Sequence, residues 1–186
     1  GIRAPIGEVV DAGGGAFSFE PPQANPLSGK AEGEVSRLDI ENSLRFDNGL
    51  STVQLTPQQL KQVLEHAVAD TAPGATPGQF AQVAGLAFSF DPTATAQILD
   101  DDGNPTTPGE RIRTITLTDI DGAPTQTIFA DGAFAADAPA SIGVVTLDFL
   151  AGGGDGYPFS NYGAVTDLGI GEQDALYDHM SEVYVA

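Results

Sequence analysis

A run of three glycines, Gly152–Gly154, lies between the residues of this chain that are best suited to hold a ligand. Asp155 follows the run directly, and the aromatic residues Phe149 and Tyr157 lie on either side of it. Glycine loses more backbone entropy on folding than any other residue, so three in succession need a reason. One reason is a plain turn. The other is a loop whose backbone approaches a ligand, with the carboxylate of Asp155 at its rim, and the residues alone leave both open.

Candidates for catalysis or metal binding are few elsewhere. The chain has two histidines and no cysteine. His66 and His179 both lie in stretches with helical spacing, and we interpret them as surface or packing residues. The run Asp100–Asn104 is acidic, but Gly103 comes too early for a calcium-binding loop and no glutamate follows in register. We therefore expect a solvated hairpin tip there, no metal site, and no catalytic residue in this chain.

The composition favours a globular protein and excludes several partners. The chain has 186 residues, of which 41% are hydrophobic, so one domain with an ordinary core is expected. Its net charge is −19 with only seven Lys and Arg residues. Such a surface repels nucleic acid polymers and anionic lipid. No apolar run approaches the length of a membrane-spanning helix, so membrane insertion is not expected.

Two N-terminal capping signals mark the helices that position these residues. Ser36 with Asp39 predicts the start of a short helix, and Thr56 with Gln59 predicts a second helix over about residues 57–69. Pro57 suits the first position of the second helix. A third amphipathic helix is predicted over about residues 172–183, from Leu176, Met180 and Val183.

Alternating and β-branched patterns predict the strands. The predicted strands cover residues 50–55, 80–90, 112–118, 127–129 and 142–150, and residues 16–19 could contribute a short hairpin. Because strands and helices do not alternate as regular βαβ units, we expect an α+β layered domain with mixed sheets flanked by helices.

Five stretches, taken in order, resemble motifs of the C-terminal, substrate-recognition domain of the 5′-nucleotidase family, which includes ecto-5′-nucleotidase and bacterial UDP-sugar hydrolases. These stretches are Gly1–Arg3, Val35–Phe46, Thr56–Val68, Gly78–Leu86 and Asp148–Tyr157. Each motif is short, but the ordered set covers nearly the whole chain. The resemblance implies a single such domain over residues 1–186, with a Gly- and Pro-rich insertion at about residues 8–33.

The resemblance also implies a ligand site that binds a nucleoside or nucleotide. Phe46 and Phe149 are expected to stack on the two faces of the base, because every base has a π-face. Asp155 is expected to accept hydrogen bonds from ribose hydroxyls, and Arg3 to lie on the phosphate side, where its planar fork suits phosphate oxygens. Asn48 is expected at the edge of the base.

The family's reaction needs more than this chain offers. The resemblance implies a phosphoric monoester hydrolase whose divalent metal pair lies in an N-terminal metallophosphatase domain, so we expect the present chain alone to be inactive. The opening Gly1-Ile2-Arg3 is typical of the middle of a loop, and we expect a piece of a longer protein. The resemblance further implies a periplasmic or extracellular location.

Three departures from the family pattern keep other functions open. Arg45, Asp47 and Asp148 stand where the family usually has Pro, Gly and Asn, and a negative charge at Asp47 opposes anion binding unless the side chain points away. The alternative is a non-catalytic extracellular structural or adhesion module with the same fold. A calcium-stabilised domain is a third possibility.

Overall fold

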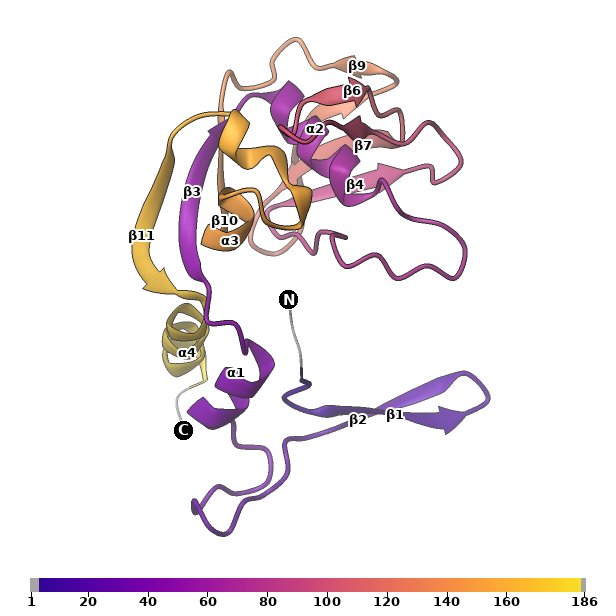
Figure 1. Ribbon diagram of the computed structural model, residues 1–186. Coiled ribbons are helices and arrows are strands. Elements are labelled where there is room, and N and C mark those ends of the chain that lie inside the picture. Colours follow the sequence, from indigo (N-terminus) through magenta and orange to yellow (C-terminus); the bar gives the residue numbers. More distant parts are fainter. Residues whose placement is uncertain (1–3, 185–186) are drawn as a thin grey trace. The chain divides into compact units, whose positions relative to one another are not determined.

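The computed structural model describes residues 4–184, and these form two compact units (Figure 1). The first unit comprises the described residues up to 50 together with those from 169 onward, and the second comprises residues 51–168. Both units combine helices with sheets, so the predicted α+β class is confirmed. That residues 1–186 act as a single domain, and that residues 8–33 are an insertion, stay predictions.

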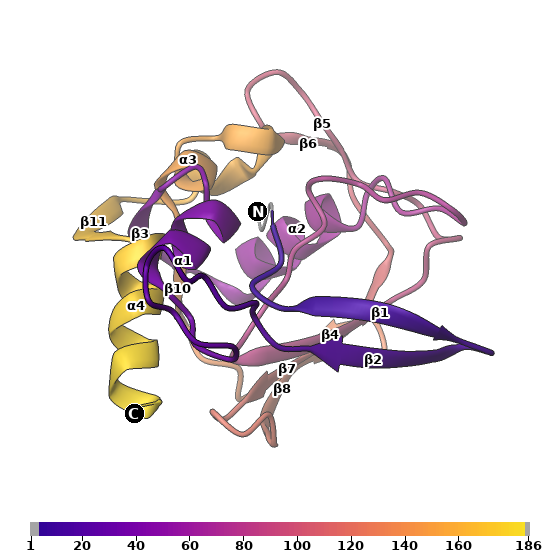
Figure 2. The same ribbon diagram turned by 90° about the horizontal axis from the view of Figure 1, so that it is seen from below.

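The first unit contains a β-hairpin and two helices. Its elements are β1 (Glu8–Gly13), β2 (Ala16–Glu20), α1 (Arg37–Ser43) and α4 (Glu172–Val183). β1 and β2 pair antiparallel, with Val9 opposite Phe19, and extend as the two-stranded ribbon visible in Figure 2. Phe19 is 82% exposed, and no residue of β1 or β2 is buried, so this ribbon adds no side chain to a hydrophobic core.

The two helices of the first unit begin where the sequence predicts. Ser36 and Asp39 form a complete capping box at the start of α1. α1 packs against α4. The contact is partly polar, because the buried side chain of Gln173 donates a hydrogen bond to the carbonyl of Leu44 at 3.0 Å. Val183, which was expected on the apolar face of α4, is 55% exposed.

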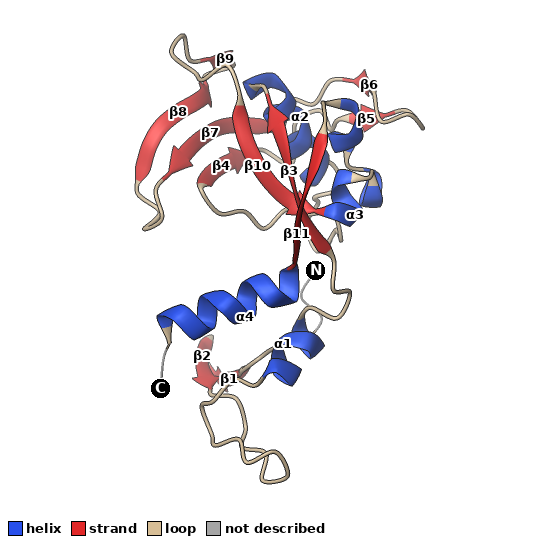
Figure 3. Cartoon of the chain, turned by 90° about the vertical axis from the view of Figure 1, so that its left-hand side faces the viewer, coloured by secondary structure: helices blue, strands red, loops and turns tan. Residues whose placement is uncertain are grey.

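The second unit is built from three sheets (Figure 3). Strands β10, β3 and β11 form one sheet in that order, β4, β7, β8 and β9 form a second, and β5 and β6 form a third. The strand bounds are β3 (Gly49–Leu55), β4 (Leu86–Phe90), β5 (Ile98–Leu99), β6 (Pro105–Thr107), β7 (Ile112–Thr118), β8 (Pro124–Ala130), β9 (Ala133–Phe134), β10 (Ile142–Leu147) and β11 (Val165–Gly171). The four-stranded sheet is antiparallel throughout.

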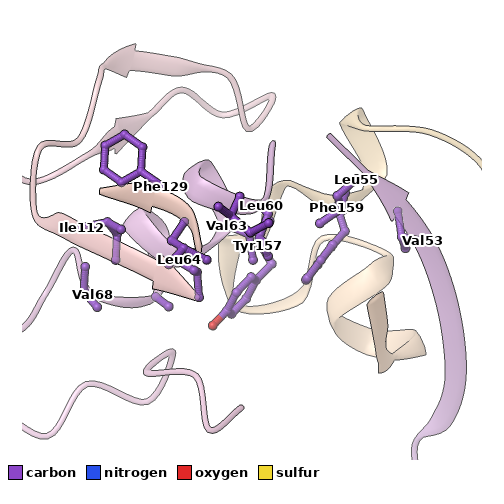
Figure 4. Packing of buried hydrophobic residues seen from close by; sticks show 13 residues of the cluster. Val53, Leu55, Leu60, Val63, Leu64, Val68, Ile112, Phe129, Tyr157 and Phe159 are labelled. Carbon is purple, nitrogen blue, oxygen red and sulfur yellow. The ribbon is translucent and has the colours of Figure 1, made fainter. Parts of the chain in front are cut away.

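Helix α2 (Pro57–Ala67) supplies the centre of the hydrophobic core. Thr56 and Gln59 form the predicted capping box, and Pro57 occupies the first turn. The apolar stripe of α2 joins side chains from both larger sheets and from the segment that follows β10, as Figure 4 shows. The core comprises Val53, Leu55, Leu60, Val63, Leu64, Ala67, Val68, Ile112, Ile115, Ile128, Phe129, Tyr157 and Phe159.

A buried carboxylate ties α2 to the strand β7. Glu65 is 1% exposed and accepts three hydrogen bonds. Lys61 donates at 2.6 Å, and the backbone N–H groups of Arg111 and Ile112 each donate at 3.0 Å. A buried charge with this many partners satisfies the rule that buried polar groups are hydrogen-bonded.

Arg111 closes the other end of α2. Its guanidinium Nη1 donates to the carbonyls of Val68, Ala69 and Thr71 at 2.8–3.0 Å. These are carbonyls at the end of the helix and just beyond it, where a positive charge also suits the helix dipole. Neither Glu65 nor Arg111 stood out in the sequence, because their partners are distant in the chain.

Two predicted strands were wrong in part. The strand expected at residues 80–90 is only β4, because Gly85 adopts φ 76° and interrupts the extended backbone. Phe80 instead packs from a loop, with its ring centroid 6.0 Å from that of Phe90. The strand expected at residues 142–150 ends at Leu147, where α3 (Asp148–Ala151) begins.

Other elements match or extend the predictions. Asp100–Asn104 is the expected hairpin turn, in which the carboxylate of Asp100 accepts hydrogen bonds from backbone N–H groups, including that of Asn104 at 2.8 Å. Strand β11 was not predicted, because glycines and exposed positions obscure its alternation. Over residues 4–184, none of the helices has both the length and the apolar character that crossing a membrane requires.

Candidate functional site

The candidate site in the second unit is the segment directly after β10. It consists of α3 and two short 3₁₀ turns, η1 (Gly154–Gly156) and η2 (Pro158–Asn161). The Asp148 carboxylate, at the first position of α3, accepts a hydrogen bond from the N–H of Phe149 at 2.6 Å. α3 therefore presents Phe149 at the start of the glycine turn, and the ring remains 51% exposed.

Three glycines of this turn, Gly153, Gly154 and Gly156, have a structural reason. Gly153 has φ 96° and Gly156 has φ 73°, a backbone region that L-residues with side chains rarely adopt. A Cβ atom on Gly154 would lie 2.5–2.6 Å from ring carbons of Phe149. The turn therefore needs these three glycines whether or not a ligand binds. The glycines do not distinguish a plain turn from a ligand-binding loop, and that distinction depends on the neighbouring side chains.

Asp155 lies at the exposed tip of this turn. It has φ 51°, a left-handed conformation that Asp tolerates better than most residues. Its backbone carbonyl accepts a hydrogen bond from Nε2 of His66, in α2, at 2.8 Å. Asp155 is exposed, and among residues 4–184 no hydrogen-bond donor contacts its carboxylate, so the carboxylate can accept hydrogen bonds from a ligand.

Tyr157 holds the end of this turn against the protein through contacts with His66 and Gln79. Its ring is buried and meets the ring of His66 edge-on, with centroids 4.8 Å apart. Its hydroxyl donates to the carbonyl of Gln79 at 2.5 Å. Burial raises the pKa of Tyr157 to about 12, with a further contribution from the charge of Asp155. The hydroxyl thus stays protonated, and remains a donor, at every physiological pH.

A cleft of about 630 Å³ lies beside the glycine turn. Its lining includes His66 and four aspartates, Asp70, Asp100, Asp101 and Asp102, but no Lys or Arg from the described part of the chain. Neither Phe149 nor Asp155 lines it. The negative charge of this cleft disfavours anionic ligands.

In the first unit, Phe46 and Asn48 lie in the turn between α1 and β3. Phe46 is 57% exposed. Asn48 is held by Glu172: its backbone N–H and its side-chain amide both donate to Oε1 of Glu172, at 3.1 and 2.9 Å. The backbone N–H of Glu172 in turn donates to the Asn48 carbonyl at 2.9 Å. The side-chain nitrogen of Asn48 is therefore engaged within the protein.

The departure at Asp47 has a conformational explanation. Asp47 has φ 50°, so this turn requires a residue that tolerates the left-handed region, where glycine is the default and Asp is among the exceptions. One oxygen of its carboxylate lies near Gly171, 3.2 Å from where a Cβ of that glycine would be. The carboxylate is therefore directed toward the start of α4.

The structure thus places Phe149 and Asp155 together on one loop of the second unit, and Phe46 and Asn48 together in one turn of the first. Arg3 lies outside the described residues. His66 packs against the glycine turn, as a packing residue should, but its sequence context gave no sign of the hydrogen bond to Asp155.

Within residues 4–184, no group of three or more His, Cys, Asp or Glu side chains is arranged to hold a metal ion. The resemblance assigns the divalent metal pair to a further N-terminal domain, and that expectation stays a prediction.

Comparison with known proteins identifies relatives of one kind. A sequence profile for the C-terminal domain of 5′-nucleotidase matches residues 14–161. Protein 5NUC from Lutzomyia longipalpis is 36% identical over 61 residues, which is 33% of this chain and 11% of that protein. The matched profile includes Phe46, Asn48, Phe149 and Asp155.

Solved structures share the fold. The 5′-nucleotidase precursor from Thermus thermophilus superposes with a TM-score of 0.62 at 23% identity, covering 84% of this chain and 26% of that one. The NAD nucleotidase (NadN) from Haemophilus influenzae gives a TM-score of 0.57 at 21% identity, covering 82% of this chain and 24% of that one. The present chain therefore spans only a minor part of the length of these relatives.

Proposed function

Because this chain belongs to the family of 5′-nucleotidase C-terminal domains, we propose that it recognises the nucleoside part of a nucleotide. The observation that carries the proposal is the segment after β10, where an exposed ring, Phe149 in α3, is soon followed by an exposed carboxylate, Asp155 in η1. A flat apolar base and a hydroxyl-bearing sugar need these two kinds of group.

Base stacking is assigned to Phe46 and Phe149. Both rings are about half exposed, 57% and 51%, which is unusual for phenylalanine and leaves ring surface to cover a base. Stacking of a base on an aromatic ring contributes roughly 1–3 kcal/mol. Since stacking reads no base edge, we propose that the chain accepts more than one base.

Polar recognition is assigned to Asp155, Asn48 and Arg3. The solvent-facing carboxylate of Asp155 accepts hydrogen bonds from ribose hydroxyls. The amide nitrogen of Asn48 donates one of its two hydrogens to Glu172, which leaves its carbonyl oxygen and its second N–H to contact the edge of the base. Arg3 contacts the phosphate side.

The intact protein is proposed to be a phosphoric monoester hydrolase acting in nucleotide catabolism. A further N-terminal metallophosphatase domain supplies the divalent metal pair, and the present chain holds the nucleoside end of the substrate. The protein works in the periplasm or outside the cell. Alone, the 186-residue chain is proposed to bind nucleosides weakly and to hydrolyse no nucleotide.

The proposal is tested by titrating adenosine into the chain up to millimolar concentration and following amide shifts by NMR. We expect saturable shifts that include Phe149 and Asp155, and a loss of affinity of about five- to fiftyfold in Phe149→Ala. Phe19→Ala is the matched control, because Phe19 is an exposed ring on the separate β1–β2 ribbon. Equal affinity in both variants, or no shift at the loop, contradicts the proposal.

A non-catalytic extracellular structural or adhesion module is the second candidate. The exposed apolar residues of the β1–β2 ribbon, Val9, Phe17 and Phe19, favour a surface that contacts another macromolecule. This candidate predicts no nucleoside binding, so the same titration separates the two.

A further inference from the structure

We propose that His66 is a positioning residue for sugar recognition: from α2 it holds the backbone carbonyl of Asp155 and so fixes the direction of the Asp155 carboxylate. The inference rests on the proposed function, because it concerns how the chain recognises the ribose hydroxyls. His66 does not contact the ligand in this proposal and acts only through Asp155.

The hydrogen bond itself determines the state of the imidazole. Nε2 of His66 lies 2.8 Å from the carbonyl oxygen of Asp155. A carbonyl oxygen can only accept, so Nε2 must carry the proton. Both the neutral tautomer protonated at Nε2 and the doubly protonated ring satisfy this requirement.

Three contacts fix the ring of His66 against the turn. Besides the bond to Asp155, the ring meets that of Tyr157 edge-on at 4.8 Å. Gly156 approaches so closely that a Cβ atom there would lie 3.2 Å from Cε1 of His66. The ring therefore contacts three consecutive residues, Asp155, Gly156 and Tyr157, and leaves the turn little freedom to rotate.

The helix that carries His66 is firmly held, whereas the turn needs support. α2 is capped by Thr56 at its start, and Arg111 binds the carbonyls beyond its end. Asp155 has φ 51°, a conformation that non-glycine residues keep only when their surroundings impose it. The bond from His66 is such a constraint, and it acts on the residue whose carboxylate is proposed to bind the sugar.

A pair of substitutions separates this role from simple packing. In His66→Gln, the side-chain amide nitrogen lies at the position of Nε2 and can still donate to the carbonyl of Asp155. In His66→Asn, the amide is one bond shorter and cannot reach it. Both variants remove the aromatic ring, so a packing role predicts that they behave alike.

A pair of ligands separates an effect on the sugar from an effect on the base. Adenosine offers the 2′- and 3′-hydroxyls of its ribose, and 2′,3′-dideoxyadenosine lacks both. We expect His66→Asn to weaken adenosine binding to the 186-residue chain by about three- to tenfold and dideoxyadenosine binding by less than about twofold. His66→Gln should bind adenosine within about twofold of the unmodified chain.

Amide hydrogen exchange gives a second measurement that needs no ligand. The N–H groups of Gly156 and Tyr157 donate within the turn, to the carbonyls of Gly153 and Gly154. We expect them to exchange about tenfold faster in His66→Asn than in His66→Gln, while the amides of α2 exchange equally in both.

The outcomes are distinguishable. If the unmodified chain binds neither ligand, the proposed function fails, and equal exchange of the turn amides in the two variants would then overturn the positioning role as well. If the chain binds adenosine but His66→Asn weakens both ligands equally, nucleoside recognition stands and the positioning role is overturned. Equal adenosine affinity of His66→Asn and His66→Gln would likewise overturn the positioning role and leave nucleoside recognition standing.

Discussion

Gly154 has no side chain, and this allows its backbone to pack directly against the ring of Phe149. Its backbone lies so close to Phe149 that a Cβ would come within 2.5 Å of the ring. The ring is thereby supported on one side while half of its surface stays exposed. Because backbone approach rather than a positive φ requires glycine here, the requirement can be tested by one methyl group.

We predict that Gly154→Ala displaces the ring of Phe149, lowers the free energy of unfolding by about 1–3 kcal/mol, and weakens adenosine binding about as much as Phe149→Ala does. Gly152→Ala is the matched control, because its Cβ would lie 3.4 Å from the carbonyl oxygen of Asp148, close to ordinary contact. Urea unfolding and an adenosine titration measure both effects. If the two alanine variants are alike, the supporting role of Gly154 is wrong.

A second prediction concerns the buried carboxylate of Glu65. Glu65→Gln keeps the size of the side chain but replaces one acceptor oxygen by a donor that faces N–H groups or Lys61. We expect the free energy of unfolding to fall by about 2–4 kcal/mol.

Glu41→Gln is the control for Glu65→Gln, because Glu41 pairs with Arg37 at the surface and should contribute less than about 1 kcal/mol. Denaturant unfolding of the whole chain, followed for both variants, gives the comparison. Similar losses in the two variants would show that the hydrogen bonds of Glu65 are not important for stability.

At the scale of elements, the capping box of α1 links stability to pH. Hydrogen bonds from the side chain of Ser36 and from Lys30 hold the pKa of Asp39 at about 2, below its ordinary value of 3.8. A carboxyl whose pKa is lowered on folding stabilises the folded state above its unfolded pKa. This stabilisation is lost as the pH falls from about 4 to about 2.

We therefore predict that Asp39→Asn is less stable than the unmodified chain at pH 7 and that the difference disappears below about pH 2. Urea unfolding of the two chains at a series of pH values between 7 and 2 gives the measurement. A stability difference that does not change between pH 7 and pH 2 would exclude this linkage.

Elements with local signals could be predicted from the sequence, and elements fixed by distant contacts could not. Both capping boxes and the bounds of α4 are encoded within a few residues. The end of β10 is different: the apolar run continues through Leu150, and the turn of α3 interrupts the strand without a change in hydrophobicity. Strand β11 has little apolar alternation and depends on its pairing with β3.

The candidate site shows the same division. Family motifs singled out Phe149 and Asp155 as candidates, and in the structure Phe149 lies in α3 and Asp155 in the η1 turn that follows it. The hydrogen bond from His66 to Asp155 joins residues 89 positions apart, so no local pattern reveals it. Asn48 was interpreted as a contact to the base, and its bond to Glu172 became visible only in the structure.

At the scale of the whole molecule, the charge of −19 is the dominant feature. Self-repulsion among like charges opposes the compact state, and salt screens it. We predict that raising the NaCl concentration from 0.05 to 0.5 M at pH 7 raises the melting temperature by about 2–5 °C.

Near the isoelectric point of about 4.1, the same addition of salt should have almost no effect on the melting temperature. Differential scanning calorimetry at the two pH values provides the comparison. An equal rise of the melting temperature at both pH values would mean that salt stabilises the chain because it is excluded from the protein surface, and not because it screens the net charge.

The central proposal, that a base stacks on the rings of Phe46 and Phe149, is tested most directly by intermolecular nuclear Overhauser effects in the chain saturated with adenosine. The account predicts contacts from the H2 and H8 protons of the base to the ring protons of both phenylalanines in the same complex. Contacts to only one of the two rings, or to neither, would contradict it.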